Sequence, residues 1–333
     1  MVFLKNVAIV GATGTVGKFI ASELVHSNQH TVTALTRDAT APGLPTGVHA
    51  VAVDYADPST LVAALQGIDV LIITMASTAP RDTQAKLIEA AASAGVKYVV
   101  PNGWGVDASH PAAAETLIGP LLAGAQELTE ARGMGWITFT SGFWYEFSLA
   151  GKRNWFGFDI EERSVVLFDD GRTKVNTSTW AQTGRAVAAV LAQDEAALAA
   201  KYRNKNVYFS SFYVSQRDML DSLLRVTGTQ ESDWKIEYEP SAERFAKAIA
   251  IVKTGDFSAF ERALYSRWFF PEAEGVGASA WQAHHTLANE ELGLPQEDLD
   301  ERTKYTVDHQ KELMGKYGRP RHERTEPVRS IVP

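Results

Sequence analysis

Residues 6–27 read NVAIVGATGTVGKFIASELVHS: an apolar run, a glycine-rich turn and a segment with helical apolar spacing. The glycines Gly11, Gly14 and Gly17 have the spacing G-x-x-G-x-x-G. Between a strand and a helix, this spacing is a variant of the dinucleotide fingerprint. The first glycine permits the tight turn, the second lets the backbone approach a pyrophosphate, and the third lets the helix pack against the strand.

The residues between these glycines, Thr13, Thr15 and Val16, line the same turn. Threonine hydroxyls can contact phosphate oxygens, and the helix that follows presents N–H groups and a partial positive charge at its start. We therefore predict that the turn binds the pyrophosphate of a dinucleotide. The alternative is a structural turn that binds no ligand.

The strand–helix alternation continues to about residue 145. Apolar runs predict strands at 31–37, 48–55, 69–75, 96–101 and 136–141, with helices at 58–67, 83–95 and near 112–132. Uninterrupted apolar strands are typical of a parallel sheet that helices cover on both faces. The order of the elements predicts an α/β fold with a Rossmann-type, doubly wound parallel sheet.

Beyond residue 145 the pattern is looser. We predict a hairpin over 163–176 around Asp170 and Gly171, a helix over 179–193 and a strand over 206–212. The helix and the strand would return to the first sheet. The cofactor domain would then comprise residues 1–150 and about 175–213, and a smaller, mainly helical substrate-binding region would comprise 151–174 and 214–333, with an irregular arm at 318–333.

The composition argues against several classes of protein. The formal net charge of −8 disfavours a nucleic-acid-binding surface, and there is no cysteine for disulfides, thiolate nucleophiles or zinc–thiolate sites. No apolar run approaches the roughly 18 residues that span a bilayer. The adjacent His284 and His285 would point apart on a helix and would not chelate one metal together. We expect a cytoplasmic protein that binds no metal, nucleic acid or membrane.

The end of the second predicted strand indicates which dinucleotide binds. NAD enzymes usually carry an acidic residue there for the ribose 2′-hydroxyl, whereas an arginine suits the 2′-phosphate of NADP. Arg37 holds this position, and its guanidinium offers two donors to a phosphate. This favours NADP(H). The alternative is that Arg37 is a solvated loop residue and that Asp38 binds the ribose.

Four stretches of the chain resemble a known family. The turn GATGTVG (11–17), the arginine-ended second strand, TQAKLIEAAASAGVKYVVPNGWG (83–105) and TFTSGFWYEFS (138–148) are similar to NmrA-like and isoflavone-reductase-like proteins. These proteins are atypical short-chain dehydrogenase/reductases, and the third of the stretches resembles their P-x-x-x-G loop while the last resembles their fungal branch. The resemblance is good over residues 4–150 and looser beyond.

The resemblance implies positions for the cofactor. Asp54 and Tyr55, at the end of the third strand, would flank the adenine, and Ser77, after the fourth strand, would face the adenosine and pyrophosphate. Two short segments would lie along the nicotinamide: Asn102, Gly103 and Trp104, and Ser141, Gly142 and Phe143.

The sequence departs from the family in its catalytic residues. Ordinary short-chain dehydrogenases use Tyr-x-x-x-Lys, but none of the ten tyrosines here has a lysine four positions later. The isoflavone-reductase branch carries a lysine in the helix after its P-x-x-x-G loop, yet no lysine occurs between Lys97 and Lys152. The corresponding position falls near Leu122 or Gly124, so the catalytic base of the family is not carried over.

Three residues are candidates for proton transfer. Tyr145, just past the sixth strand, could donate from its phenol or be a packed aromatic residue. Lys152 could be its electrostatic partner or a surface lysine. His110, in the loop after the fifth strand, could donate a proton near neutral pH or be solvated.

Together these observations predict an NADPH-dependent reductase of an aromatic or polyketide-like small molecule. It would transfer a hydride to a carbonyl group or an activated C=C bond. Aromatic residues of the second half could wall such a substrate, although most of them would belong to the core. The alternative is an NADP(H)-sensing, NmrA-like regulator that binds the dinucleotide and a protein partner without catalysis.

Overall fold

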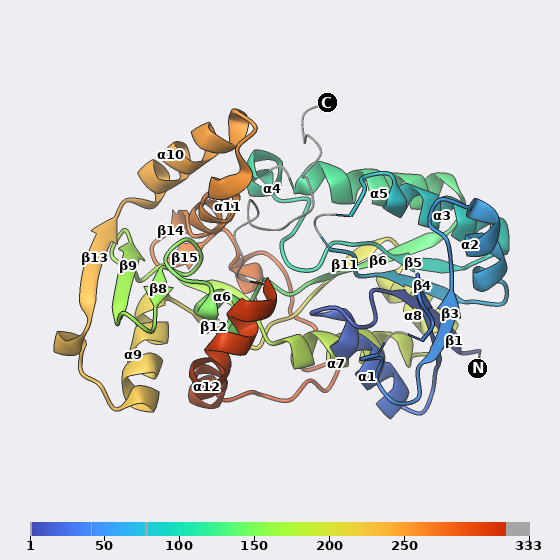
Figure 1. Cartoon of the computed structure of the whole chain (residues 1–333), viewed down its shortest axis with the longest axis horizontal. Helices are drawn as coiled ribbons and strands as arrows, with labels where there is room; N and C mark the ends of the chain where they lie inside the picture. Colours follow the sequence, from blue (N-terminus) through green and yellow to red (C-terminus); the bar gives the residue numbers. More distant parts are fainter. Residues whose placement is uncertain (1, 41, 77–78, 117, 318–333) are drawn as a thin grey trace.

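The computed structural model describes residues 2–40, 42–76, 79–116 and 118–317, so Ser77 and the arm predicted at 318–333 lie outside the described residues. A seven-stranded parallel sheet forms the centre of the first half (Figure 1). Its strands, in spatial order, are β11 (Lys205–Tyr208), β6 (Gly135–Thr140), β5 (Tyr98–Val100), β4 (Val70–Ile73), β1 (Asn6–Val10), β2 (Thr31–Thr36) and β3 (His49–Ala52). From β3 to β6 the order is 3-2-1-4-5-6, which is the Rossmann order, and the predicted fold class is confirmed.

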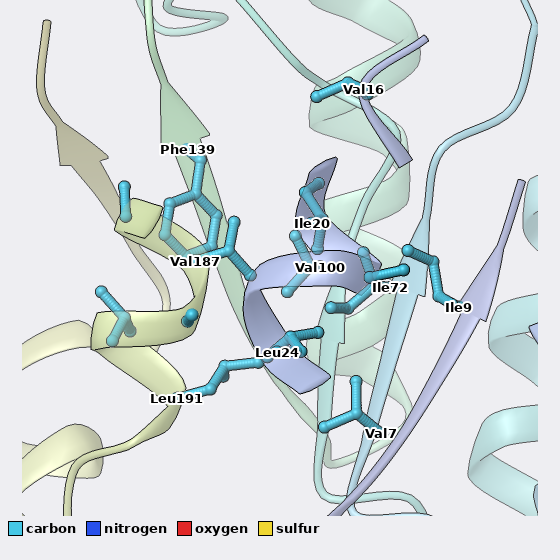
Figure 2. Close-up of a cluster of buried hydrophobic side chains, with 14 of the residues drawn as sticks. Val7, Ile9, Val16, Ile20, Leu24, Ile72, Val100, Phe139, Val187 and Leu191 are labelled. Atoms are coloured by element: carbon cyan, nitrogen blue, oxygen red, sulfur yellow. The ribbon is translucent and has the colours of Figure 1, made fainter. Parts of the chain in front are cut away.

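Helices α1 (Gly17–His26) and α7 (Trp180–Leu191) pack together on one face of this sheet. Figure 2 shows Ile20 and Leu24 of α1 and Val187 of α7 among the apolar side chains of the strands. Burying one such side chain fully contributes roughly 1.5–3 kcal/mol. This contact therefore fixes α1, and with it the glycine-rich turn that precedes it.

Helices α2 (Pro58–Leu65), α3 (Thr83–Ala94) and α5 (Gly119–Ala131) cover the opposite face. Asp57 begins α2 by accepting a hydrogen bond from Ser59 N at 2.9 Å. Because helices cover both faces, the inner strands need apolar side chains on both sides, and all four residues of β4 are buried. No helix within the described ranges has the length and apolar content to cross a membrane.

The second half of the chain adds two small sheets, β12-β10-β7 and β13-β9-β8, a two-stranded sheet β14-β15, and further helices. The bounds are β7 (Phe143–Trp144), α6 (Tyr145–Ala150), β8 (Phe158–Asp159), β9 (Ser164–Phe168), β10 (Val175–Ser178), α8 (Glu195–Tyr202), β12 (Phe212–Val214), α9 (Gln216–Thr227), β13 (Lys235–Glu239), α10 (Ser241–Lys253), α11 (Phe260–Trp268), β14 (Pro271–Ala273), β15 (Val276–Gly277) and α12 (Leu299–Tyr317).

A separate core in this second half is dense in aromatic rings. Its fully or almost fully buried members include Phe156, Phe158, Trp268, Phe269 and Trp281. Several of these rings meet edge to face, an arrangement that aromatic pairs prefer. Most of the aromatic residues of the second half are therefore core residues and do not wall an open pocket.

The hairpin predicted over 163–176 is wrong. A turn is present, with Gly171 N donating to Phe168 O at 2.8 Å, but the strands on either side of it join different sheets. β9 pairs with β8 and β13, whereas β10 pairs with β7 and β12. The apolar pattern identifies a strand without identifying its partner, and here the partners come from distant parts of the chain.

Two further predictions are corrected. The strand predicted over 206–212 divides into β11 and β12, which belong to different sheets. The helix predicted near 112–132 divides into α4 (Pro111–Glu115) and α5. Pro120 stands in the first turn of α5, where it costs no helical hydrogen bond, and would disrupt the interior of a single long helix. The domain boundaries near 150, 175 and 213 stay a prediction.

Candidate cofactor site and active site

The glycine-rich turn packs directly on the end of β4. Gly11 has φ +84°, and a Cβ atom added there would lie 2.1 Å from the carbonyl oxygen of Thr74. A Cβ atom added at Gly17 would lie 2.1 Å from Gly11 O. Thr74 Oγ1 in turn donates a hydrogen bond of 2.6 Å to Val10 O, which ties β4 to β1. Only glycine fits at positions 11 and 17, as the fingerprint requires.

The middle of the turn is open to a ligand. Thr13 is exposed, Gly14 and Thr15 are partly exposed, and Val16 is buried and anchors the start of α1. No side chain in the described part of the chain caps α1. The first N–H groups of a helix need an acceptor, and a phosphate group is well suited to supply it. The turn therefore fits the pyrophosphate of a dinucleotide.

Arg37 lies just past β2 and is exposed, and none of the described residues forms a hydrogen bond or an ion pair with its guanidinium. Its neighbour Asp38 is engaged locally, because its Oδ1 accepts hydrogen bonds from Thr40 N at 2.8 Å and from Thr40 Oγ1 at 2.6 Å. The hydrogen bond from the Thr40 hydroxyl holds the pKa of Asp38 below its usual value. Arg37 is thus the residue at this edge that is free to bind a phosphate.

Two residues expected beside the adenine lie near Arg37, past the end of β3. Tyr55 donates a hydrogen bond of 3.2 Å from its phenol to Leu35 O, and burial raises its pKa while the positive charge of Arg37 opposes the rise. Asp54 accepts a hydrogen bond from Ala56 N at 2.8 Å. The structure therefore brings Arg37 and Tyr55 together at the carboxyl ends of β2 and β3.

The loop after β5 lies across the carboxyl ends of neighbouring strands. The Asn102 side chain accepts a hydrogen bond from Met75 N and donates one to Met75 O, both at 3.1 Å. Trp104 Nε1 donates to Ile73 O at 2.8 Å, and its ring stacks on Phe139 with a centroid distance of 6.0 Å. These contacts hold the loop over the region where the nicotinamide is expected.

Leu122 of α5, one of the two positions near which the resemblance places the family lysine, packs against Gly103. A Cβ atom added at Gly103 would lie 2.4 Å from Leu122 Cδ2, and Leu122 is buried. The first turns of α5 therefore place an apolar side chain directly against the loop, near the position where the resemblance leads us to expect the family lysine.

The segment 141–143 is joined by hydrogen bonds to the loop after β5 and to Ser178 of β10. Gly142 N donates to Gly105 O at 3.0 Å, which joins this segment to the loop after β5. Ser141 is fully buried, and its carbonyl accepts a hydrogen bond from the Ser178 hydroxyl at 2.6 Å. The ring of Phe143 belongs to the aromatic core of the second half.

Tyr145 and Lys152 do not form a catalytic pair in this structure. Tyr145 is fully buried, shares a hydrogen bond of 2.6 Å with Thr303 Oγ1 and packs edge to face on Phe212. Burial raises the pKa of its phenol. Lys152 is half exposed, with its Nζ 3.7 Å from the carboxylate of Asp159. This geometry favours the two alternatives, a packed aromatic residue and a surface lysine.

The structure places His110, a candidate from the sequence, among acid–base groups that the sequence analysis did not connect with it. We call Asp107, His110, Glu272, His284 and His285 the histidine–carboxylate cluster. His110 Nε2 lies 2.8 Å and His284 Nε2 lies 3.2 Å from the two oxygens of Glu272, and His285 Nε2 lies 3.8 Å from Asp107 Oδ2.

His284 and His285 follow a short 3-10 helix and do not lie on an α-helix, contrary to the expectation, because Trp281–Ala283 ends just before them. The cluster draws on residues far apart in the sequence, so no local spacing could have indicated it. Within the described ranges, no group of three or more His, Asp or Glu side chains is arranged to hold a metal ion.

These features define a Rossmann-type α/β protein with a dinucleotide loop at the carboxyl edge of its sheet. Residues 11–138 match a protein family described as NAD(P)H-binding. The prediction of a nicotinamide dinucleotide cofactor is thereby confirmed.

The chain is also similar along most of its length to individual oxidoreductases. It is 26% identical over 303 residues to "Oxidoreductase aprR" of Aspergillus flavus, covering 89% of this chain and 96% of that protein. Among solved structures, an isoflavone reductase has a TM-score of 0.70 at 20% identity, covering 91% of this chain and 99% of that one. AtPrR2, solved with NADP+ and (+)pinoresinol, has a TM-score of 0.68 at 16% identity, covering 92% and 100%. The resemblance to isoflavone-reductase-like proteins is confirmed.

Proposed function

We propose that the protein is an NADPH-dependent reductase of an aromatic or polyketide-like small molecule, acting on a carbonyl group or an activated C=C bond. The observation that carries the proposal is the dinucleotide loop at the start of α1, which no described side chain caps, with the guanidinium of Arg37, which no described residue pairs, one strand away. The oxidoreductases to which the chain is similar support the reaction class.

The preference for NADPH follows from charge. A 2′-phosphate beside Arg37 would form charge-assisted hydrogen bonds, and the neighbouring carboxylate of Asp38 is already bonded to Thr40. The solved structure of AtPrR2 contains NADP+, which supports the same choice.

Side chains at the carboxyl edge of the sheet support the proposed substrate class. Trp104 in the loop after β5, and Trp144 and Phe147 after β6, are only partly buried. Trp144 and Phe147 contact each other at 5.9 Å, edge to face, close to α1 through Trp180 and Phe19. Partly exposed rings beside a cofactor site favour a planar, mostly apolar ligand.

The test combines binding and turnover. NADPH and NADH affinities are measured by nucleotide fluorescence, and NADPH oxidation is followed with quinones, enones and aryl ketones. We expect tighter binding of NADPH than of NADH, and turnover of at least one class of substrate. Tight NADPH binding without turnover of any of them would favour the non-catalytic regulator, an alternative that finds no support among the similar proteins.

A further inference from the structure

We propose that His285, positioned by Asp107, donates the proton that completes the reduction. The inference rests on the reductase function proposed above. It assigns the catalytic role left open by Leu122 to a histidine from the far end of the chain.

Asp107 is a buried carboxylate whose two oxygens both accept hydrogen bonds. It is 2% exposed, and its Oδ1 accepts hydrogen bonds from Ser109 N at 2.8 Å and Ser109 Oγ at 2.6 Å. Its Oδ2 accepts a hydrogen bond from the Tyr208 phenol at 2.8 Å and lies 3.8 Å from His285 Nε2. At this distance the charge of the buried carboxylate stabilises the protonated form of the imidazole, and Tyr208, which bonds to Asp107, contacts the ring of His285.

The His285 side chain packs on a neighbouring ring and is still partly exposed. Its ring stacks on the ring of Tyr208, with centroids 3.8 Å apart and planes 6° apart, and its side chain remains 37% exposed. With Nε2 facing Asp107, the second ring nitrogen, Nδ1, makes no hydrogen bond with any described residue and is available to a ligand. An oriented, accessible imidazole is the arrangement that general acid catalysis requires.

The pair lies toward the edge of the sheet where a substrate beside the nicotinamide is expected. Tyr208 ends β11 in register with Thr140, which ends β6, and both strands point to the carboxyl edge, where α/β proteins bind ligands. Neighbouring strands are about 4.8 Å apart, so Tyr208 lies about 10 Å along this edge from the end of β5.

The pair also lies on the same face of the sheet as the residue that replaces the family base. Gln126 of α5 donates a hydrogen bond to Thr138 Oγ1 of β6, and Thr138 bonds to Asn206 of β11. Asn206 Nδ2 donates to Asp107 Oδ1 at 3.3 Å. This chain of contacts runs from α5, which carries Leu122, to Asp107.

NADPH and the His285 imidazolium together supply the hydride and the proton that reduce a carbonyl group to an alcohol. When bound, NADPH supplies a hydride to the carbonyl carbon of the substrate and becomes NADP+. The π electron pair of the C=O bond passes to the oxygen, which takes the proton from Nδ1 of the His285 imidazolium. The product is an alcohol, and the neutral imidazole recovers its proton from water.

The charges around His285 set its pH dependence. Partial burial lowers its pKa, Asp107 opposes this, and His284 and His110 lower the pKa further. Glu272 of β14 faces those two histidines, and the Tyr208 phenol faces Asp107. We expect turnover to rise as the pH falls through a pKa below the ordinary 6.5 of histidine, since the donor must be protonated.

The experiment compares His285→Gln and Asp107→Asn with the wild type. The matched control is His49→Gln, because His49 is exposed at the start of the edge strand β3. NADPH affinity, melting temperature and the pH profile of kcat are measured with any substrate that the wild type reduces. His285→Gln should lower kcat at least about 100-fold, abolish the acid-favoured limb and leave NADPH affinity unchanged. Asp107→Asn should move that limb to lower pH, which a purely structural role would not do.

The outcomes distinguish a failure of the His285 role from a failure of the reductase function. If His285→Gln retains kcat within threefold of the wild type, or loses NADPH affinity in parallel with kcat, the role of His285 is overturned and the reductase function stands. If the wild type oxidises no NADPH with any of the substrates, the reductase function fails and the proton donor fails with it.

Discussion

Replacing Glu146 by glutamine should stabilise the protein at pH 8 much more than at pH 5. Glu146 is 3% exposed in α6, and its Oε2 has no hydrogen-bond partner among the described residues. Burial raises its pKa from the ordinary 4.5 to about 8, and the nearby carboxylate of Glu297 contributes to the rise, while Arg302 and the Trp180 backbone oppose it. The folded chain therefore holds a proton that the unfolded chain releases.

The sign and size of the effect follow from linkage. A carboxyl group whose pKa is raised on folding contributes stability that is fully present below pH 4.5 and is lost as the pH rises to about 8. With these two values, ionisation costs the folded state about 1 kcal/mol at pH 5 and about 4 kcal/mol at pH 8. The wild type should thus lose about 3 kcal/mol from this group over that range.

Urea unfolding of the wild type and Glu146→Gln at pH 5, 6, 7 and 8 measures this loss. The glutamine amide has polar atoms of its own to satisfy, but that cost does not depend on pH. The advantage of the variant in free energy of unfolding should therefore grow by about 3 kcal/mol from pH 5 to pH 8. The exposed Glu127 on α5 provides the control variant Glu127→Gln. A difference between Glu146→Gln and the wild type that stays constant across the four pH values would refute the reasoning.

Three further predictions concern the cofactor loop and the residues near it. Arg37→Ala should weaken NADPH binding by about 1.5–3 kcal/mol, the value of a hydrogen bond to a charged group, and leave NADH nearly unchanged in calorimetry; equal losses would exclude a phosphate role. Gly17→Ala should lower the melting temperature and the NADPH affinity, because the added Cβ atom would lie 2.1 Å from Gly11 O. The control is Gly124→Ala on α5, where no atom lies within 4 Å of the added Cβ atom, and this variant should raise the melting temperature. Tyr145→Phe should cost about 0.5–1.5 kcal/mol in urea unfolding through loss of the bond to Thr303 and should not change kcat; a 100-fold fall in kcat would restore its catalytic role.

The sequence predicts the central sheet well because its strands are marked by local patterns. Each parallel strand is an apolar run bounded by turn residues, and Gly11, Gly14 and Gly17 mark the first βα turn unambiguously. Arg37 was identifiable because its position relative to the second strand is fixed by the fold.

The remainder depends on contacts between residues distant in the sequence. The partners of β9 and β10 are chosen by tertiary packing, so the turn at Gly171 looked like a hairpin without being one. Asp107 and His285 are brought together by the edge strand β11, through Tyr208. The burial of Tyr145 depends on α12, whose Thr303 meets its phenol. No spacing rule connects such positions.

The packing of Gly11 and Gly17 on Thr74 constrains how this protein can be altered. The cofactor loop and the end of β4 form one packed unit, because the Thr74 hydroxyl occupies space that a side chain at either glycine would need, and the Thr74 carbonyl does so at Gly11. An engineer who exchanges the loop for that of another dinucleotide enzyme must therefore transplant the residue at position 74 with it. A one-residue shift of β4 would leave the loop's sequence intact and still remove its support.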